Sequence, residues 1–237
     1  MTDIPYLIRD LFHVLKNGGT FQDFINRRYN KTGLDEWINF ENIETVTTKD
    51  GIVFPLRQVR TNPIQFINEV YSDYDLSDLR PDDIVLDVGA NIGCFSLLAA
   101  KKAKFVYASE PVFYKELTDN IIRNNVSNVR VSSCALSPGE FYLEFDGRKK
   151  YVYGISLTDF KNICGGHVDF LKCDCEGGEW CIKPEELEGI RRIEAEVHTF
   201  NGEDWTVFYK MLENVGFEVQ GKRNGIDTAL VHAWRKA

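Results

Sequence analysis

Short apolar runs alternate with helix-length segments from residue 84 to the end of the chain. This alternation is typical of βαβ units, which build a mainly parallel sheet. The predicted strands are Ile84–Val88, Phe105–Ser109, Val129–Ser133, Val168–Cys173, Ile193–Val197, Phe217–Gln220 and Thr228–Trp234. The predicted helices between them start near Gly93, Val112, Pro184 and Asp204. The pattern therefore predicts an α/β fold.

An additional pair of strands interrupts this alternation. The turn Pro138-Gly139 precedes the strand-like run Phe141–Phe145, and the region around Tyr151 has similar character. We expect these two segments to form a small hairpin inserted into the α/β domain.

The first part of the chain has a different pattern, beginning with two predicted helices. Apolar residues recur at helical spacing between Ile4 and Leu15, and Gly18-Gly19 follows as a stop signal. Thr20 then has the character of an N-cap for a second short helix. We expect both helices to pack on the main body of the protein.

A hairpin and a third helix are predicted after these two helices. The β-rich runs Ile43–Thr47 and Ile52–Val59 flank Asp50-Gly51, which is a strong short-range hairpin signal. Pro63 is a suitable first residue for the next helix. The sequence thus predicts an N-terminal helical and hairpin extension over residues 1–78 and an α/β domain over residues 79–237.

The composition is that of an ordinary globular protein. The chain has 237 residues, of which 43% are hydrophobic and 27% charged. Its net charge of −8 argues against a nucleic acid or an anionic membrane as the main partner. The N-terminus lacks a secretory signal pattern, and no apolar run approaches the roughly 20 residues of a membrane helix. We expect a cytoplasmic protein without membrane insertion; its oligomeric state is open, with a homodimer as one option.

The cysteines favour free thiols over a metal centre. Four of the six, Cys164, Cys173, Cys175 and Cys181, lie in one short stretch. Their spacing matches no standard pair of zinc-binding knuckles, and a cytoplasmic setting keeps thiols reduced. We therefore predict no metal site.

A glycine-containing loop joins the strand Ile84–Val88 directly to a helix. Gly89 and Gly93 allow the backbone to approach a nucleotide-like ligand where the helix N-terminus points. The dinucleotide fingerprint requires Gly-x-Gly-x-x-Gly, whereas Asn91 occupies its second glycine position. Asp87 at the strand end suits a cationic ligand group better than a pyrophosphate. The loop therefore favours S-adenosylmethionine over NAD as cofactor.

A second acidic residue supports an adenosine cofactor. Glu110 ends the next strand about 20 residues after the loop, where an acidic residue in this architecture accepts both ribose hydroxyls. Asp87 and Glu110 can each be an ordinary solvated carboxylate, but their joint spacing argues for a cofactor site.

These segments resemble the FkbM-type class I S-adenosylmethionine-dependent methyltransferases over roughly residues 52–220. The matching segments are Asp87–Gly93, Glu110-Pro111, Cys134–Ser137, Leu157–Phe160, Leu171–Glu179 and Glu194–His198. The resemblance implies a Rossmann-like fold with a mainly parallel seven-stranded sheet and an antiparallel last strand. It also implies a cofactor site formed by Asp87, Gly89, Ala90, Asn91, Gly93, Glu110, Pro111, Cys134, Ala135 and Asp174.

The candidate catalytic residues are Asp174 and Glu176, which follow the fourth strand, and His198, which closes the fifth. Asp174 is placed nearest the methyl donor and acceptor, and His198 is a natural proton acceptor from a hydroxyl. Glu176 and His198 each have a structural alternative, and for Glu179 we favour capping of the following turn. Trp180 is the first candidate for an aromatic wall around dispersed positive charge.

The predicted function is an S-adenosylmethionine-dependent methyltransferase of the EC 2.1.1 type. Its expected reaction is O-methylation of a hydroxyl on a small molecule or saccharide, with no nucleic acid as partner. The alternatives are an N-methyltransferase, an NAD-type oxidoreductase and a cofactor-binding module without turnover. Fold analogy alone does not separate these alternatives.

Overall fold

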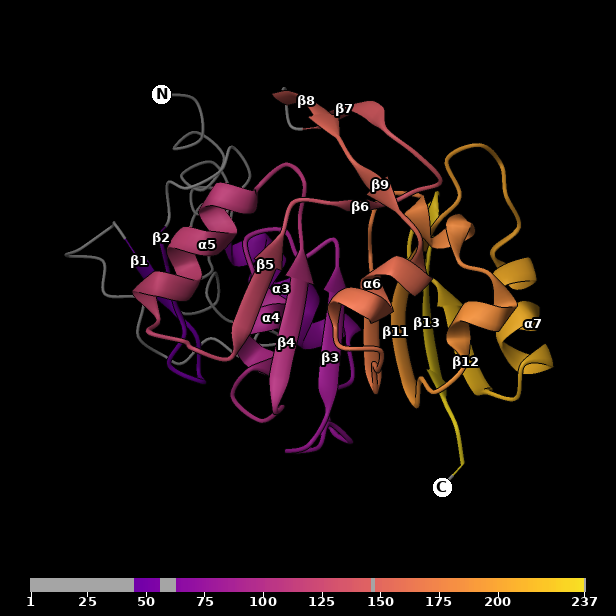
Figure 1. Cartoon of the computed structure of the whole chain (residues 1–237), viewed down its shortest axis with the longest axis horizontal. Coiled ribbons are helices and arrows are strands. Elements are labelled where there is room, and N and C mark those ends of the chain that lie inside the picture. The colour runs from indigo at the N-terminus through magenta and orange to yellow at the C-terminus, as the bar shows by residue number, and fades with distance from the viewer. Residues whose placement is uncertain (1–44, 56–62, 146–147, 237) are drawn as a thin grey trace, which may run out of the picture. The chain divides into compact units, whose positions relative to one another are not determined.

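The computed structural model describes residues 45–55, 63–145 and 148–236 (Figure 1). The chain divides into two compact units, Met1–Asp73 and Tyr74–Ala237, and each is described by itself. The predicted boundary between residues 78 and 79 stays a prediction. The helices predicted between Ile4 and Leu15 and after Thr20 lie outside the described residues.

The described part of the first unit is a hairpin and a helix. Strands β1 (Thr45–Thr47) and β2 (Val53–Pro55) pair antiparallel, with Thr47 opposite Val53. Gly51 has φ 74° and donates its N–H to the Thr48 carbonyl at 2.9 Å, a left-handed turn conformation that glycine adopts without strain. Helix α3 (Pro63–Asp73) follows. The predicted hairpin around Asp50-Gly51 and the predicted helix start at Pro63 are confirmed.

A seven-stranded sheet forms the centre of the second unit, in the order β12-β13-β11-β10-β3-β4-β5. Neighbouring strands are parallel except for β13, which is antiparallel to both β11 and β12. The bounds are β3 Ile84–Val88, β4 Phe105–Ser109, β5 Val129–Ser132, β10 Phe170–Cys173, β11 Arg192–His198, β12 Glu218–Arg223 and β13 Thr228–Trp234. The predicted mainly parallel sheet with an antiparallel last strand is confirmed.

Helices, short strands and turns connect the sheet strands. The helices are α4 Cys94–Ala99, α5 Tyr114–Arg123, α6 Leu157–Ile163 and α7 Trp205–Asn214. Outside the main sheet, β6 Ala135–Leu136 pairs in parallel with β9 Gly154–Ile155, and β7 Phe141–Phe145 pairs antiparallel with β8 Arg148–Val152. The 3-10 turns are η1 Gly178–Cys181 and η2 Pro184–Leu187. The inserted hairpin is thus confirmed.

Two helix predictions differ from the structure. The helix predicted at Pro184 is only the 3-10 turn η2, and Gly189 follows it with φ 79°, outside the helical region. Helix α6 was not predicted, although it begins with a capping box. Ser156 Oγ accepts from the Asp159 N–H at 3.1 Å, and Asp159 Oδ2 accepts from the Ser156 N–H at 3.1 Å. Within the described residues, no helix is long and apolar enough to cross a membrane.

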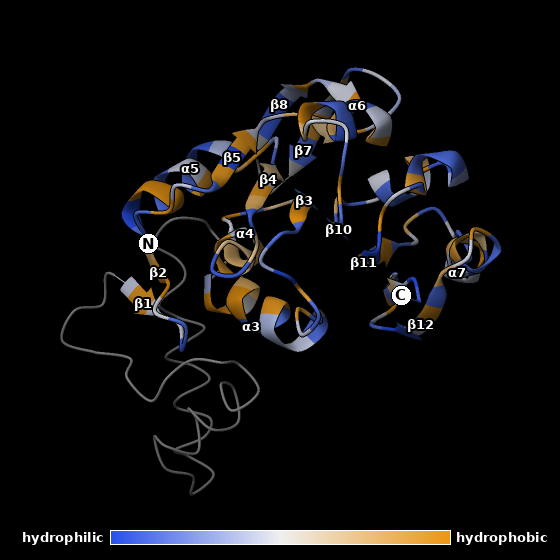
Figure 2. Ribbon diagram, turned by 60° about the horizontal axis from the view of Figure 1, so that its bottom comes forward, coloured by the Kyte–Doolittle hydropathy of each residue, from blue (hydrophilic) through white to orange (hydrophobic). Residues whose placement is uncertain are grey.

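One face of the sheet is covered by α6, η2 and α7. Their buried side chains share a core cluster with the strands, including Phe160, Leu187, Phe208, Leu212, Leu171, Ile193 and Val231. Figure 2 shows both orange and blue segments along α5 and α7, as expected of helices with one buried and one exposed face. The core thus fixes the positions of the strand ends that carry the polar residues.

Strand β11 is apolar on one face and polar on the other. Ile193, Ala195 and Val197 belong to the core cluster. Because strand side chains alternate, the four polar residues between and beside them share the opposite face. These are Arg192, Glu194, Glu196 and His198. One strand therefore links the amino end of the sheet to the candidate site at its carboxyl end.

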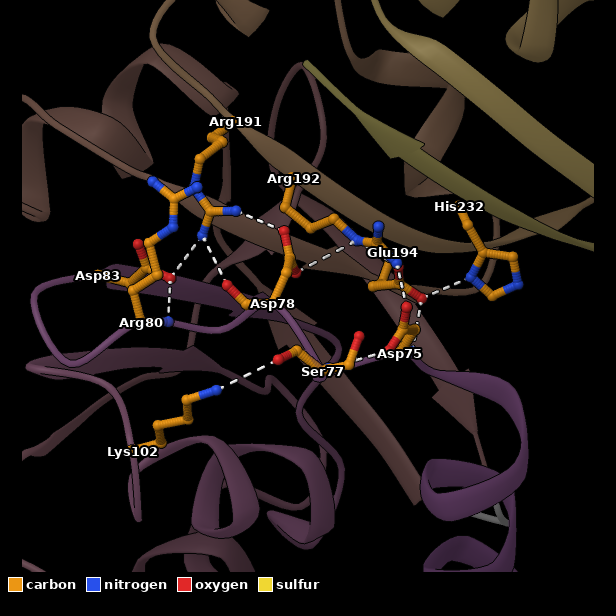
Figure 3. A network of polar contacts seen from close by, with 10 residues as sticks. All are labelled: Asp75, Ser77, Asp78, Arg80, Asp83, Lys102, Arg191, Arg192, Glu194 and His232. Carbon is orange, nitrogen blue, oxygen red and sulfur yellow. Dashed lines mark hydrogen bonds and ion pairs between the residues drawn. The ribbon is translucent and has the colours of Figure 1, made fainter. Parts of the chain in front are cut away.

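Arg191 anchors the segment that leads into β3 (Figure 3). Its guanidinium donates to Asp78 Oδ2 at 2.5 Å and to Asp83 Oδ2 at 2.7 Å. Asp83 is buried and also accepts from the Arg80 N–H at 2.8 Å. Burial raises the pKa of Asp83, while the Arg80 N–H and the Arg191 charge oppose that shift. The Arg191 contacts fix the segment at the amino end of the sheet.

Glu194 anchors the beginning of the same segment. It has no exposed surface, and Oε1 accepts from Arg192 Nε at 2.8 Å. Its Oε2 contacts His232 Nδ1 at 2.6 Å and accepts from the Asp75 N–H at 3.0 Å. Arg192 also reaches Asp75 Oδ2 at 3.0 Å. Asp75 is thus tied to β11 through both its backbone and its side chain.

Replacing Glu194 with Gln is expected to lower the free energy of unfolding by about 3 kcal/mol, because it leaves the buried Arg192 without its main counterion. Chemical denaturation at neutral pH measures this change. The matched control is Lys102→Ala, which removes an exposed ammonium that donates to the Ser77 carbonyl. The control should change stability by less than about 0.5 kcal/mol. Equal effects of both variants would contradict an anchoring role for Glu194.

Candidate functional site

The candidate site lies at the carboxyl ends of β3 and β10. From β3 the chain moves to β4 and β5 on one side, and it later returns to form β10 and β11 on the other side. Ligands of open α/β sheets bind in the crevice at such a switch in strand order. The loop after β3 and the acidic segment after β10 both emerge there.

Close backbone packing explains the two glycines of the first loop. A Cβ on Gly89 would lie 1.6 Å from the Asp174 carbonyl oxygen, and the residue has φ 78°. A Cβ on Gly93 would lie 2.6 Å from Leu117 Cδ1, and its φ is 93°. The left-handed backbone strains any side chain at both positions, and at Gly89 the Asp174 backbone also leaves no room for a Cβ. The N–H groups of Gly89 and Ala90 donate to the Ser109 carbonyl at 2.9 and 3.0 Å, which joins the loop to β4.

Glu110 organises the loops after β3 and β4. It is 6% exposed, and its Oε2 accepts from the Asn91 N–H at 2.8 Å. Its Oε1 accepts from the N–H groups of Val112 and Phe113 at 2.6 and 3.0 Å. Burial raises the pKa of Glu110, and the three N–H groups oppose that shift. Its predicted contact with ribose hydroxyls stays a prediction, and the structure adds this role in shaping the loops.

Asn91 adopts a left-handed conformation within the first loop. Its φ is 51°, and its Oδ1 accepts from the Ile92 N–H at 2.8 Å. Asparagine tolerates this backbone better than most residues because its side chain bonds locally. The residue therefore replaces the middle glycine of the dinucleotide fingerprint without loss of the turn.

The remaining predicted cofactor residues lie next to these loops. Pro111 directly follows Glu110 and is partly buried. The Cys134 carbonyl accepts from Ser109 Oγ at 2.7 Å, and the Ala135 N–H donates to the Tyr153 carbonyl at 2.9 Å. The segment after β5 is thus held beside the end of β4, as an adenine-bordering segment requires.

Asp87 lies beneath the first loop. It has no exposed surface, and its Oδ2 accepts from Ser96 Oγ at 2.5 Å. Its Oδ1 lies 3.3 Å from Lys172 Nζ, and the same ammonium donates to the Gly89 carbonyl at 2.7 Å. Burial raises the pKa of Asp87, and Lys172 opposes that shift. The cation that Asp87 meets in the structure is therefore a residue of this chain.

Asp174 is the central carboxylate of the site. Its side chain is 27% exposed, and its Oδ2 accepts from the Tyr74 hydroxyl at 2.8 Å and lies 3.6 Å from Lys172 Nζ. Burial and the Asp174 charge raise the pKa of Tyr74 well above its ordinary value, so the hydroxyl stays a donor. Tyr74 was missed in the sequence because it precedes the predicted domain boundary and belongs to no recognisable motif.

The loop after Asp174 is closed by Glu179. This residue is fully buried and accepts from the N–H groups of Cys175 and Gly177 at 2.6 and 2.9 Å. Glu176 has φ 57° and Gly177 has φ 101°, so the chain turns sharply within the loop. Glu179 thus has a structural role, as expected, but it lies within η1 and its carboxylate binds the loop that precedes this turn.

His198 lies among carboxylates at the end of β11. It is 5% exposed, with Nδ1 3.4 Å from Glu179 Oε1 and Nε2 3.6 Å from Glu176 Oε2. Burial alone would lower its pKa, but Glu179, Asp174 and Glu176 together raise the pKa of His198 to about 9. The imidazole is therefore mostly protonated at neutral pH. In this state it donates protons, whereas the sequence interpretation gave it the role of a base.

Trp180 supports the backbone of His198. Its Nε1 donates to the His198 carbonyl at 2.6 Å, and its ring packs edge-on against Phe208 of α7. Trp180 thus belongs to the partly buried packing of the core cluster. Phe200 is 55% exposed, and its ring lies 5.0 Å from the His198 ring.

Two groups of described residues have the chemistry of metal ligands. Asp174, Glu196 and His198 bring one ligand atom each within 4.8 Å of one another, and so do Cys173, Cys175 and Glu179. The Cys173 and Cys175 sulfurs are 3.6 Å apart, and burial contributes to raising the pKa of both thiols, which opposes metal thiolate formation. The expectation of no metal stays a prediction. Glu196 was not selected from the sequence; its alternation with His198 along β11 was the available signal.

Comparisons with known proteins give partial matches. No family model matches the chain. The probable cobalt-precorrin-6B C(15)-methyltransferase (decarboxylating) of Methanococcus maripaludis is 32% identical over 80 residues, which are 32% of this chain and 42% of that protein. The 31-O-demethyl-FK506 methyltransferase FkbM of Streptomyces tacrolimicus is 36% identical over 104 residues, which are 40% and 39% of the two chains. The chain thus spans about two fifths of the length of these curated relatives.

A solved structure matches over most of the chain. The fibrillarin pre-rRNA processing protein of Methanococcus jannaschii has a TM-score of 0.50 and 12% identity, covering 87% of this chain and 88% of that one. The fold is thus the Rossmann-like fold of class I methyltransferases, which confirms the predicted fold class. The two curated relatives are methyltransferases, but the FkbM match covers too little of the chain to show the family. The uncharacterized RNA methyltransferase TTE1812 of Caldanaerobacter subterraneus subsp. tengcongensis is 38% identical over 82 residues, which are 33% of this chain and 18% of that protein, so the comparisons do not support excluding nucleic acid as a partner.

The His198 imidazole is expected to titrate near pH 9 in the folded protein. Because this pKa is raised above the ordinary value, the stabilisation is fully present below about pH 6.5 and is lost as pH rises through 9. Histidine NMR signals across pH 5 to 10 measure the titration, and His198→Gln identifies the signal. In the wild type, the free energy of unfolding should fall as the imidazole loses its proton. This fall should be absent in His198→Gln. Titration near 6.5 would show that the carboxylates do not hold the proton.

Proposed function

We propose that the chain is an S-adenosylmethionine-dependent methyltransferase of the EC 2.1.1 type that methylates a hydroxyl on a small molecule or saccharide. The observation that carries this proposal is the meeting of the Gly89–Gly93 loop with Asp174 at the switch in strand order. A glycine loop there allows close approach of a nucleoside, and the acidic residues beside it select a ligand with positive charge.

The charge of the site fits the proposed cofactor. Asp174, Glu176 and Glu196 lie around His198, and the buried Lys172 is already shared with Asp87. Carboxylates are in excess, which favours a sulfonium and an ammonium group and disfavours the pyrophosphate of NAD. The backbone of the Gly89–Gly93 loop would hold the methionine part, and Glu110, Pro111, Cys134 and Ala135 would border the adenosine.

When bound, S-adenosylmethionine supplies an activated methyl group on a sulfonium. Asp174 is oriented for this site by the Tyr74 hydroxyl and the Lys172 ammonium. Glu176 and Glu196 are proton acceptors for an acceptor hydroxyl, because burial raises the pKa of both above that of an ordinary glutamate. His198, held protonated, keeps these carboxylates charged and in place. Asp174, Glu176 and His198 therefore remain the proposed catalytic group, with His198 as its cation.

A nitrogen acceptor is the second candidate. The carboxylates that surround His198 would equally attract an acceptor that carries an amino group. A neutral amine is already nucleophilic, so its methylation needs positioning more than a base. The pH dependence of turnover separates the two acceptors.

Calorimetry should show binding of S-adenosylmethionine and its demethylated product, with NAD much weaker. Glu110→Gln should weaken both nucleosides by about 1.5 to 3 kcal/mol, because it removes a charged acceptor. Glu185→Gln, an exposed carboxylate on η2, is the matched control and should bind as wild type. Treatment with a metal chelator should leave cofactor binding unchanged, because the proposal assigns no metal ion to the site. Tight NAD binding with no response to either methionine nucleoside would favour an oxidoreductase.

Turnover is expected to fall as pH rises through about 9, because the His198 proton is then lost. His198→Gln should abolish this alkaline limb while keeping cofactor affinity. Asp174→Asn should lower turnover at every pH, because it removes the carboxylate that is placed nearest the methyl donor and acceptor. These profiles require labelled methyl donor and an acceptor found by screening metabolites. A rate that instead rises through a pKa near 6.5, and loses this rise in His198→Gln, would restore His198 as the base.

A further inference from the structure

Three exposed tyrosines lie in contact on the β7–β8 hairpin. Tyr142 is 69% exposed, Tyr151 44% and Tyr153 58%. The ring centroids of Tyr142 and Tyr151 are 5.1 Å apart, and those of Tyr151 and Tyr153 are 5.7 Å apart. Large aromatic side chains that gather on the surface, in place of scattering singly, mark a binding surface. We call these three residues the tyrosine row.

The strand register places the tyrosine row on one face of the hairpin. Tyr142 lies directly opposite Tyr151, so these two side chains share a face. Tyr153 lies one residue beyond the end of β8, and its ring contact with Tyr151 places it beside this pair. Phe141 lies opposite Val152 on the other face, where Val152 is 1% exposed. The hairpin is therefore packed through its other face, and the tyrosine row is not required for that packing.

The tyrosine row begins beside the candidate site. The Tyr153 carbonyl accepts from the Ala135 N–H at 2.9 Å, at the start of the β6–β9 pair. A Cβ on Gly178 of η1 would lie 2.6 Å from the Leu136 carbonyl oxygen, so the acidic loop packs directly on β6. Figure 1 shows the hairpin beyond the end of the sheet where β5 passes into β6. The backbone of Tyr153 is therefore joined through β6 to the acidic loop that follows Asp174.

The charges on this face argue against a polyanion. The register places Glu144 opposite Lys149 beside Tyr142 and Tyr151, and Glu140 accepts from the Tyr151 hydroxyl. The Lys149 ammonium lies 5.5 Å from the Tyr142 ring centroid. Two carboxylates thus face one ammonium, whereas surfaces that stack nucleic-acid bases combine aromatics with a positively charged groove.

We infer that the tyrosine row binds a neutral saccharide. A sugar ring presents flat C–H faces that pack on tyrosine rings, and its hydroxyls pair with the tyrosine hydroxyls and with Glu140. Such a ligand needs no positive groove, and the described charges beside the tyrosines are two carboxylates and one ammonium. One consequence of the inference rests on the proposed function. It is that the tyrosine row brings a hydroxyl of the bound sugar to Asp174.

The test uses the full chain with the demethylated cofactor on an array of neutral and acidic oligosaccharides, together with an oligouridylate. Wild type should retain neutral oligosaccharides. The double variant Tyr142→Ser/Tyr153→Ser should bind them about tenfold or more weakly, the effect of removing aromatic anchors from a binding surface. Tyr114→Ser is the matched control, because Tyr114 is exposed on α5 away from the hairpin, and it should bind as wild type. The unfolding midpoint and cofactor affinity of the double variant should be unchanged.

Retention of no neutral oligosaccharide, or equal retention by wild type and the double variant, would overturn the inference. Tighter binding of the oligouridylate that is lost in the double variant would assign the tyrosine row to nucleic acid and would equally overturn it. Failure of the proposed function has a different signature, because wild type would then not bind the demethylated cofactor. Saccharide binding that depends on the tyrosine row would stand in that case.

Discussion

The buried ammonium of Lys172 is the interaction on which the site depends. It is 4% exposed and contacts Asp87, Asp174 and the Gly89 carbonyl at 3.3, 3.6 and 2.7 Å. Burial alone would lower its pKa, but the two carboxylates raise the pKa of Lys172 above its ordinary value, so it stays charged. A single cation thus ties the loop after β3 to the acidic segment after β10. Without it, two carboxylates at the switch point would repel each other in a poorly solvated environment.

This arrangement leaves the outer carboxylates without a lysine partner. Lys172 is used between β3 and β10, so Glu176 and Glu179 have His198 as their nearby cation. The imidazole is held protonated for that reason, and its proton is part of the charge balance of the site. A mostly protonated imidazole is a poor proton acceptor at neutral pH. A base inferred from the residue type alone therefore becomes a cation once its neighbours are known.

The sequence predicted the strands and the mainly parallel sheet well because buried parallel strands are apolar runs bounded by turn residues. It also placed Gly89, Gly93, Glu110 and Asp174 at one edge, since carboxyl ends of parallel strands meet there. It could not predict partners that depend on packing across the sheet. The pairing of Asp87 with Lys172 requires that β3 and β10 be neighbours, and the contact of Tyr74 with Asp174 joins residues 100 positions apart. Helix α6 was missed for a different reason. Its first residues, next to the capping box, were interpreted as a family motif, and no helix was assigned to them.

The polar face of β11 connects the two ends of the sheet. Glu194 fixes the Asp75 backbone at 3.0 Å, and the adjacent Tyr74 donates to Asp174 at 2.8 Å. Because consecutive residues share a peptide bond, the Glu194 anchor restricts the backbone from which the Tyr74 side chain extends. His198 lies on the same face of the strand, four residues after Glu194, beyond Glu196. One strand therefore holds the backbone beside the Asp174 donor at one end and carries the cation of the site at the other.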